Sequence, residues 1–438
     1  MFEQMLKTRF FRHASILQAG SFVQFGISFV GSIAIARLLG PDQYGVWAIA
    51  IALAGIFALF LDWGQGGGAM VLFSKAYAKG DAQEMRNIGG FYIRTTILLY
   101  AGVGLVLFLF SGWLGGIFYG RSDIAWYVRF LLLAGFIATG SGLVSIILQV
   151  VRSIVPLTSI EIVDQFLKTG MMLAGLFMGF GIYGVAGGQA IGALLGFVVA
   201  LWVYRKRVQP LGLVPHIRSM LLAARHSASR AYLKFSFPIA VDKNISELYQ
   251  LGALMILGHL AQPADVGYFK IALSYITLTF LPLGAVSRLL QDQFPKDQAD
   301  NPEMLRKHFI LVSVASGFFT MASGVILVLV APFLVRLVYG ASYAGVLPYI
   351  QAFWWYAAVI GFGVGLGSIY RTLNRVSFPI KLNTVCLVIG MPLTWYLLQH
   401  AGTVGAVYGF TLMKGTATLI AFFRALWHVR KTSTYATT

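Results

Sequence analysis

The chain has 438 residues, of which 58% are hydrophobic and only 11% are charged. Soluble domains carry about 25% charged residues, so this composition excludes an ordinary soluble protein and predicts a protein with several membrane spans. The formal net charge of +18 raises the question of a nucleic-acid partner, and the single cysteine, Cys386, excludes a disulfide framework or a cysteine-based metal cluster.

Apolar runs of the length that crosses hydrocarbon follow one another along the chain. They lie near residues 15–38, 42–62, 88–110, 125–150, 158–179, 183–204, 234–258, 266–287, 308–335, 347–369, 380–399 and 403–425. We therefore predict an all-α, polytopic membrane protein with about 12 transmembrane helices.

The distribution of basic residues predicts the orientation of these spans. Most of the 33 lysines and arginines fall in the even-numbered loops and the terminal segments. The odd-numbered loops carry only Arg37, Arg121, Arg129 and Arg336. The positive-inside rule then places both termini in the cytoplasm. Because this rule also accounts for the net charge, no nucleic-acid partner is predicted.

The longest and most basic connection, residues 205–233, separates six spans from six. It divides the chain into an N-terminal lobe (1–204), a basic cytoplasmic linker (205–233) and a C-terminal lobe (234–438). Residues 217–232 fit two interpretations. They form either a basic amphipathic helix on anionic lipid headgroups, or a solvated connector that merely obeys the charge rule.

A similar helix break occurs twice, half a chain apart. Pro41 and Gly45 interrupt the first pair of apolar runs, and Pro263 and Gly267 repeat the same spacing. Proline lacks the N–H that a helix interior needs, and glycine tolerates positive φ. Trp47 follows the first break, and its amphipathic ring suits a membrane–water interface.

Further short matches follow in the same order and at nearly the same separation. They pair Asp81 with Asp300, Tyr119-Gly120 with Tyr339-Gly340, Arg152 with Arg371, and Gly184 with Gly405. An even number of spans in each repeat gives both halves the same orientation. The sequence therefore predicts two parallel six-helix repeats, an arrangement found in transporters with a central site between two bundles.

The motifs also carry a family resemblance. The run Ala-Arg-Leu-Leu-Gly-Pro-Asp-Gln-Tyr-Gly at 36–45 resembles the first-loop signature of bacterial polysaccharide-biosynthesis flippases. These are the Wzx-like branch of the multidrug/oligosaccharidyl-lipid/polysaccharide exporter superfamily. Asp62-Trp63-Gly64 and the two Tyr-Gly turns resemble further positions of that branch.

The resemblance implies a MATE-like two-lobe fold and a flippase in the bacterial inner membrane. It would move an undecaprenyl-diphosphate-linked oligosaccharide, such as an O-antigen or exopolysaccharide repeat unit, from the cytoplasmic to the periplasmic leaflet by alternating access. It implies no enzymatic activity and no cofactor. Its implied partners are the substrate, membrane lipids and neighbouring polymerases or glycosyltransferases. A monomer is expected, because two lobes can form the pathway.

Charged residues inside the spans are the candidate site, because charges at membrane depth are costly and usually face a cavity or a partner. With an anionic diphosphate as cargo, the basic ones predict a cationic cavity: Arg94, Lys168, Lys243, Lys270 and Lys414. The acidic ones are candidates for coupling to H⁺ or Na⁺: Asp242, Glu247, Glu161 and Asp164.

Local ion pairing is the alternative interpretation of these charges. Asp164 and Lys168, and likewise Lys243 and Glu247, have the i,i+4 spacing of helical ion pairs. Pro238 predicts a kink beside Asp242 that frees a backbone carbonyl.

Two other functions stay open at this stage. One is a multidrug or cation antiporter of the same superfamily, against which the cationic interior argues. The other is a membrane-embedded glycan polymerase or ligase, which would need a large periplasmic loop. The glycine-rich run 64–68 lacks the Gly-Lys-Ser/Thr ending of a phosphate loop, so it predicts a helix break and no nucleotide site.

Overall fold

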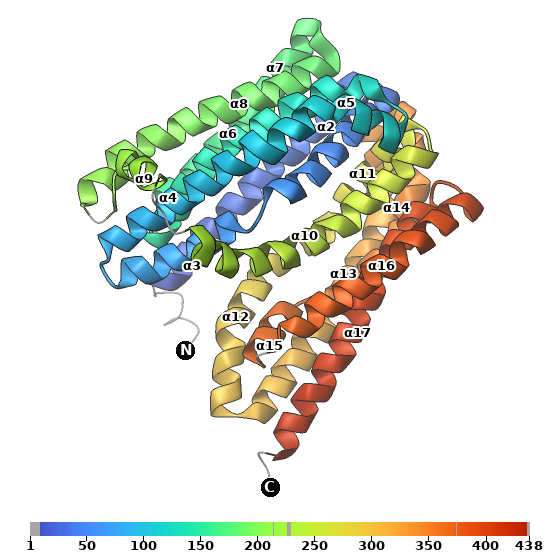
Figure 1. Ribbon diagram of the computed structural model, residues 1–438. Helices are drawn as coiled ribbons and strands as arrows, with labels where there is room; N and C mark the ends of the chain where they lie inside the picture. Colours follow the sequence, from blue (N-terminus) through green and yellow to red (C-terminus); the bar gives the residue numbers. More distant parts are fainter. Residues whose placement is uncertain (1–8, 213, 226–228, 374, 436–438) are drawn as a thin grey trace. The chain divides into compact units, whose positions relative to one another are not determined.

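The computed structural model describes residues 9–212, 214–225, 229–373 and 375–435. This part of the chain is almost entirely helical and contains no strand (Figure 1). The predicted all-α class is therefore confirmed.

The chain divides into two compact units, which we describe separately. Unit 1 comprises Met1–Leu39 and Ile49–Asn244, and unit 2 comprises Gly40–Ala48 and Ile245–Thr438. The first-loop segment Gly40–Ala48 thus belongs to unit 2, although the residues on both sides of it belong to unit 1. Helix α10 carries the chain from one unit into the other.

Unit 1 contains most of α2 and the helices that follow it as far as the first half of α10. Their bounds are α2 (Arg9–Leu61), α3 (Gln65–Ala78), α4 (Ala82–Leu99), the π-helix η1 (Tyr100–Gly104), α5 (Leu105–Tyr119), η2 (Ser122–Ile124), α6 (Ala125–Val150), α7 (Ile154–Gly175), the π-helix η3 (Leu176–Phe180), α8 (Gly181–Val203), the π-helix η4 (Tyr204–Val208), η5 (Gln209–Leu211), α9 (Ile217–Ala223) and α10 (Ser229–Leu260).

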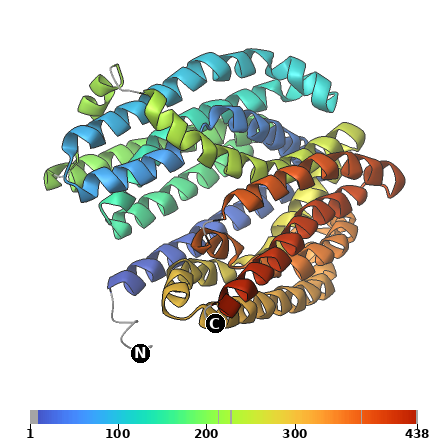
Figure 2. The ribbon, with the colours of Figure 1, turned by 60° about the horizontal axis from the view of Figure 1, so that its bottom comes forward.

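Unit 2 contains the second half of α10 and all later helices. Their bounds are α11 (Pro263–Thr277), η6 (Leu278–Phe280), α12 (Leu283–Asp300), α13 (Pro302–Val338), η7 (Ala341–Val346), α14 (Leu347–Ile360), η8 (Gly361–Gly363), α15 (Leu366–Thr372), α16 (Ser377–His400) and α17 (Gly405–Tyr435). Figures 1 and 2 both show α16 and α17 side by side.

Eight segments of the described chain are long and apolar enough to cross a membrane. Two of them, Ser15–Leu61 and Ile154–Val208, each cover two predicted spans, which are separated by breaks at Gly40 (φ 77°) and Gly179 (φ 85°). Helices α10 and α11, which cover the two other predicted spans, are not among the eight. The protein is thus a multi-pass membrane protein, and these bounds are consistent with the predicted number of spans.

The two copies of the repeated break pack directly on each other inside unit 2. A side chain at Gly45 would overlap the backbone carbonyl of Pro263, and one at Gly267 would lie 3.2 Å from the backbone nitrogen of Gly45. Glycine is required here because two backbones approach closely. Trp47, which was expected to suit a membrane–water interface, is only 2% exposed, so its side chain is buried within the protein.

Other repeated positions also have matching geometry. Gly120 and Gly340 both adopt positive φ (63° and 97°), and each follows a buried tyrosine. The N-caps of α4 and α13 are Asp81 and Asn301, whose side chains accept hydrogen bonds from the backbone N–H groups of Glu84 and Glu303. The structural match is therefore one residue further along than the sequence match of Asp81 with Asp300.

A ladder of glycines joins α7 to α8. Gly184, Gly188, Gly192 and Gly196 stand four apart, so they form one stripe along α8. A side chain at Gly184 would overlap the backbone of Gly175, and one at Gly188 would overlap that of Met171. Small residues at this spacing let membrane helices approach closely. In Figure 1, α7 and α8 lie side by side.

Candidate functional site

A break between α2 and α3 in unit 1 presents an acidic side chain. The chain turns at Gly64, which has φ 79°, and the Asp62 carboxylate accepts a hydrogen bond from the Gly64 N–H at 2.9 Å. The buried Gln65 side chain also stabilises the break, because it accepts a hydrogen bond from the Trp63 N–H and donates one to the Leu61 carbonyl. The carboxylate of Asp62 is thus fixed at a helix end.

Helix α10 brings a cation to this break. The Lys243 ammonium lies 2.7 Å from Asp62 Oδ2, and the Asn244 amide donates to the Leu59 carbonyl at 3.0 Å. The Lys243 side chain is 61% exposed, whereas that of Asp62 is 26% exposed. Lys243 was predicted as a site cation, but its spacing suggested Glu247 as partner. The structure pairs it with Asp62, which lies far away in the sequence.

Small residues allow α10 to approach the break closely. Side chains at Gly64 and Gly68 would overlap Ser236 of α10. Pro238 lies inside α10, where it removes a backbone hydrogen bond. Asp242, the first coupling candidate, lies on the same stretch, but its side chain is outside the described part of the structure.

A second charged pair lies on α7, beside the glycine ladder of α8. The Lys168 ammonium is 2.6 Å from Asp164 Oδ2, and the two side chains are 22% and 19% exposed. A side chain at Gly196 would overlap the Asp164 carboxylate, so the ladder makes room for this pair. One turn earlier, Glu161 accepts a hydrogen bond from the Gln24 amide at 3.1 Å.

Removing the Lys168 ammonium should destabilise the protein. In Lys168→Met, the half-buried Asp164 carboxylate loses its cation while its Oδ1 atom already lacks a hydrogen-bond partner. Breaking a fully buried pair in this way lowers the free energy of unfolding by about 3–5 kcal/mol. Because this pair is partly exposed, we expect a decrease of about 2 kcal/mol. The double variant Lys168→Met/Asp164→Asn should recover most of this free energy, because it no longer contains an unpaired carboxylate. Thermal unfolding of the purified variants measures both changes.

The pair of Lys307 and Glu303 provides the control. It has the same i,i+4 spacing, but its side chains are 72% and 54% exposed. Lys307→Met should therefore lower the free energy of unfolding by less than about 0.5 kcal/mol. Equal losses for the two lysine variants would show that burial does not distinguish the pairs.

The remaining candidates are distributed over both units. In unit 2, the Lys414 ammonium lies 4.8 Å from the centre of the Tyr249 ring, whose hydroxyl donates to the Asn383 carbonyl at 2.9 Å. Also in unit 2, Lys270 is partly buried on α11 and Glu247 is exposed on α10. Arg94 is partly buried on α4 in unit 1.

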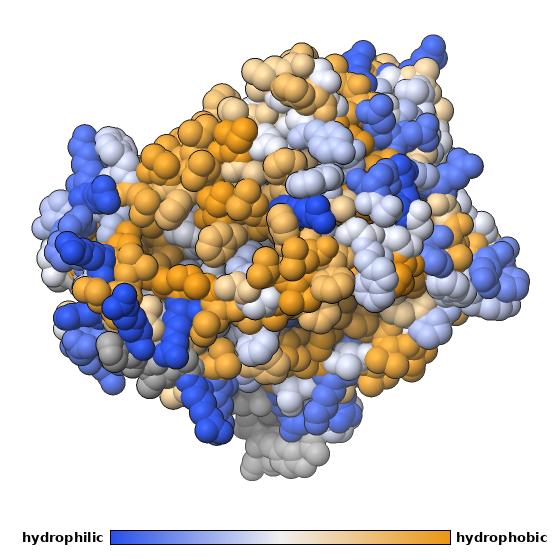
Figure 3. Space-filling model, turned by 45° about the horizontal axis from the view of Figure 1, so that its top comes forward, coloured by the Kyte–Doolittle hydropathy of each residue, from blue (hydrophilic) through white to orange (hydrophobic). Residues whose placement is uncertain are grey.

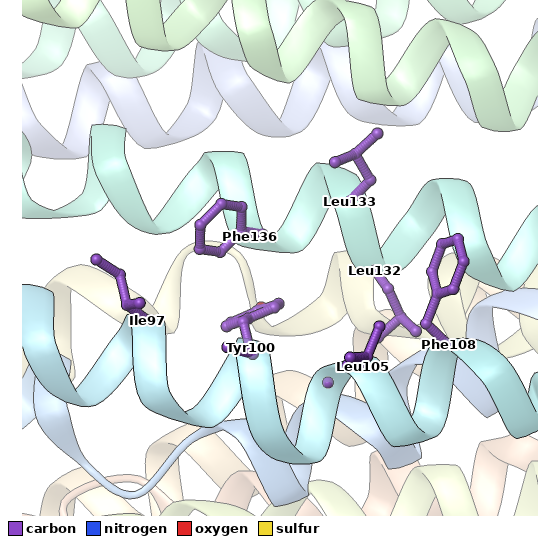
Figure 4. Close-up of a pocket in the computed structure, with 9 residues that line it drawn as sticks. Ile97, Tyr100, Leu105, Phe108, Leu132, Leu133 and Phe136 are labelled. Carbon is purple, nitrogen blue, oxygen red and sulfur yellow. The ribbon is translucent and has the colours of Figure 1, made fainter.

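An apolar pocket of about 530 Å³ lies between α4–η1–α5 and α6 in unit 1 (Figure 4). Tyr100, Leu105, Leu133 and Phe136 are among its lining residues, and the rings of Tyr100 and Phe136 lie 5.0 Å apart. The π-helix η1 runs along its wall, and such local widenings of a helix often occur at functional sites. The pocket suits a hydrocarbon chain and not a charged group. Sequence analysis missed it.

Comparison with solved structures defines the class of protein. An inward-facing MATE transporter of the MOP superfamily matches with a TM-score of 0.77 at 15% identity, covering 94% of this chain and 96% of that one. The lipid II flippase MurJ, in an inward closed conformation, matches with a TM-score of 0.75 at 16% identity, covering 94% and 87%. The chain therefore has the fold of these transporters.

Sequence comparison gives the family. The chain belongs to the family described as polysaccharide biosynthesis protein, which matches residues 10–285. The lipopolysaccharide biosynthesis protein WzxC of Escherichia coli (strain K12) is 23% identical over 415 residues, covering 91% of this chain and 77% of the relative. The resemblance seen in the first loop is thus confirmed. The two solved structures are a transporter and a flippase, in line with the prediction of a protein that is not an enzyme.

Proposed function

We propose that this protein is a flippase that moves an undecaprenyl-diphosphate-linked oligosaccharide from the cytoplasmic to the periplasmic leaflet of a bacterial inner membrane. The main support is the family match, which links the chain to a polysaccharide pathway, together with the transporter fold shared with a lipid II flippase. The proposed cargo has an anionic diphosphate, a polar glycan and a long apolar tail.

In this proposal, side chains of the two units serve two of these parts, the diphosphate and the apolar tail. Lys168, Lys243 and Lys414 would supply positive charge for the diphosphate, since lysine binds phosphate as a point charge. Arg94 and Lys270 would add to that potential. The apolar pocket beside η1 would hold a section of the polyprenyl tail, while the two units alternate in access as one monomeric transporter.

Ion coupling forms part of the same proposal. A carboxylate that binds H⁺ or Na⁺ in one state and releases it in the other would link transport to the ion gradient. Asp242 and Glu247 are the first candidates, ahead of Glu161 and Asp164, because both lie on α10 and Asp242 is one turn after Pro238.

Asp242→Asn should abolish the dependence of transport on the ion gradient, because an amide neither ionises nor exchanges a bound cation. Transport into proteoliposomes, measured with and without an imposed pH or Na⁺ gradient, tests this prediction. Glu303→Gln, at the exposed start of α13, is the control and should leave the dependence intact. An unchanged gradient response in Asp242→Asn removes this residue from the coupling mechanism.

The deciding experiment for the function is the amount and sidedness of lipid-linked oligosaccharide in cells that lack the protein. We expect an intact, unextended repeat unit to accumulate on the cytoplasmic leaflet. Accumulation on the periplasmic leaflet instead would indicate a polymerase or ligase.

The second candidate function is multidrug or cation antiport. It is favoured by the structural match to a multidrug resistance MATE transporter. If the deleted strain shows no lipid-linked intermediate but altered efflux of drugs or dyes, this function replaces the flippase proposal.

A further inference from the structure

A basic pocket of about 680 Å³ lies at the end of α8 in unit 1, where the chain turns through η4 and η5 into α9. Arg205, His216 and Arg218 line it together with apolar side chains, including Leu221 and Leu222. This is the segment for which the sequence left two interpretations open, a lipid-bound helix or a solvated connector. None of the residues proposed for the transport site lies in it.

The pocket has fixed walls. The Tyr204 side chain is buried, and its hydroxyl donates to the Pro215 carbonyl at 2.7 Å, which folds the connector back on the end of α8. The Gln209 amide also contacts the His216 ring. The connector is therefore built into unit 1 at this point.

Helix α9 is held in place by close packing on α4. Met220 is fully buried, and side chains at Gly89 and Gly90 would meet Met220 and Ala223 at 2.5–3.1 Å. This short helix thus has a defined inner face. Its outer face carries the exposed side chains of Leu221 (49%) and Leu222 (58%) next to Arg218.

The neighbouring residues mark this region as the edge of the bilayer. Trp202 is 59% exposed at the end of α8, and the Lys206 ammonium lies 4.9 Å from its ring centre. Tryptophan and lysine anchor membrane proteins at the interface. In Figure 3, hydrophilic residues gather at the left, the end of unit 1 where Figure 1 draws α9, beside an apolar surface.

We propose that this pocket binds the headgroup of an anionic phospholipid of the surrounding leaflet. Arg205 and Arg218 would bind the phosphate, for which the guanidinium group has matching bidentate geometry. Leu221 and Leu222 would lie against the upper part of the acyl chains. Basic pockets beside membrane helices on the cytoplasmic side suit this ligand class, and the connector would thereby be anchored to the bilayer.

The test compares two double variants of the full-length protein by native mass spectrometry. Arg205→Gln/Arg218→Gln removes two pocket charges, while Arg207→Gln/Arg225→Gln removes two exposed charges of the same connector that do not line the pocket. Each variant is titrated with phosphatidylglycerol and with phosphatidylcholine. Thermal unfolding of each variant first establishes that it is folded.

We expect the wild type to retain phosphatidylglycerol in preference to phosphatidylcholine. The pocket variant should bind phosphatidylglycerol at least about 10-fold more weakly, since even one charged hydrogen bond to a phosphate contributes about 10-fold. The affinity of the control variant for phosphatidylglycerol should fall less than about threefold, because its charges attract the lipid only from a distance and salt screens that attraction. Equal losses in the two variants, or equal binding of the two lipids, would overturn the proposal.

A second measurement locates the bound lipid without any substitution. Photoreactive phosphatidylglycerol should label peptides that contain residues 202–222, and labelling confined to other peptides would contradict the assignment. Undecaprenyl diphosphate is the competing ligand. If it binds with the same arginine dependence while phosphatidylglycerol does not, the pocket belongs to the transport substrate and the phospholipid proposal is wrong. None of these readouts depends on transport.

Discussion

Replacing Gly188 by leucine should remove most of the folded protein from the membrane, whereas the same change at Gly187 should have little effect. The two glycines are neighbours on α8, but a side chain at position 188 would overlap the backbone of Met171, and one at position 187 meets nothing within 4 Å. Because the obstacle is helix backbone, no side-chain rotation relieves it. Overpacking of this kind costs about 3 kcal/mol or more.

The yield of monodisperse protein and its thermal unfolding measure this effect. Leucine raises helix propensity at both positions, so any difference between the two variants reports packing alone. Gly192→Leu should behave like Gly188→Leu, because it faces the backbone of Lys168 at 2.5 Å. If the variants at positions 187 and 188 are equally stable, then α7 and α8 do not pack through this ladder.

Replacing Lys243 by methionine should lower transport by about 10- to 100-fold with little loss of stability. The Lys243 side chain is 61% exposed, so its pair with Asp62 contributes less than about 1 kcal/mol to folding. A charged hydrogen bond to a phosphate contributes about 1.5–3 kcal/mol, which corresponds to the expected loss of transport. In our proposal, Lys243 exchanges Asp62 for the diphosphate during the cycle.

The exchange of the two charges separates this role from a structural one. The double variant Asp62→Lys/Lys243→Asp restores the ion pair but places the cation on the fixed helix break. It should be about as stable as the wild type but should not recover transport. Lys206→Met, outside the site, is the control for loss of a lysine in general. Full transport in Lys243→Met, or recovery of transport in the exchanged variant, would exclude a direct role for the Lys243 ammonium.

Local patterns predicted much of the fold correctly. Gly120 and Gly340 were identified as repeated turns from two short matches, and both have the positive φ that a glycine turn requires. Pro263 and Gly267 were identified as the copy of an earlier break, although their contact with Gly45 was not foreseen. The glycine ladder of α8 was readable in principle, since spacing by four is a packing signal in membrane helices.

The partners of the candidate charges were not predictable in the same way. The spacing of Asp164 and Lys168 lies within one helix, and the structure pairs them. Asp62 and Tyr249 contact Lys243 and Lys414 through tertiary packing, which leaves no periodic signal in the sequence.

The environment of Trp47 was ambiguous from the sequence, because burial and an interfacial position both suit a tryptophan beside a helix break. In the structure the Trp47 side chain is buried within the protein.

The assignment of Gly40–Ala48 to unit 2 has a consequence for biogenesis. The ribosome releases this segment early, but Pro263, on which Gly45 packs, emerges only after all of unit 1 has been synthesised. Unit 2 therefore cannot complete its packing from its own late-made residues. A gene divided in the connector between α8 and α10 would encode two polypeptides, and the C-terminal one would lack a piece of its own unit. Only co-expression of both fragments would supply that piece.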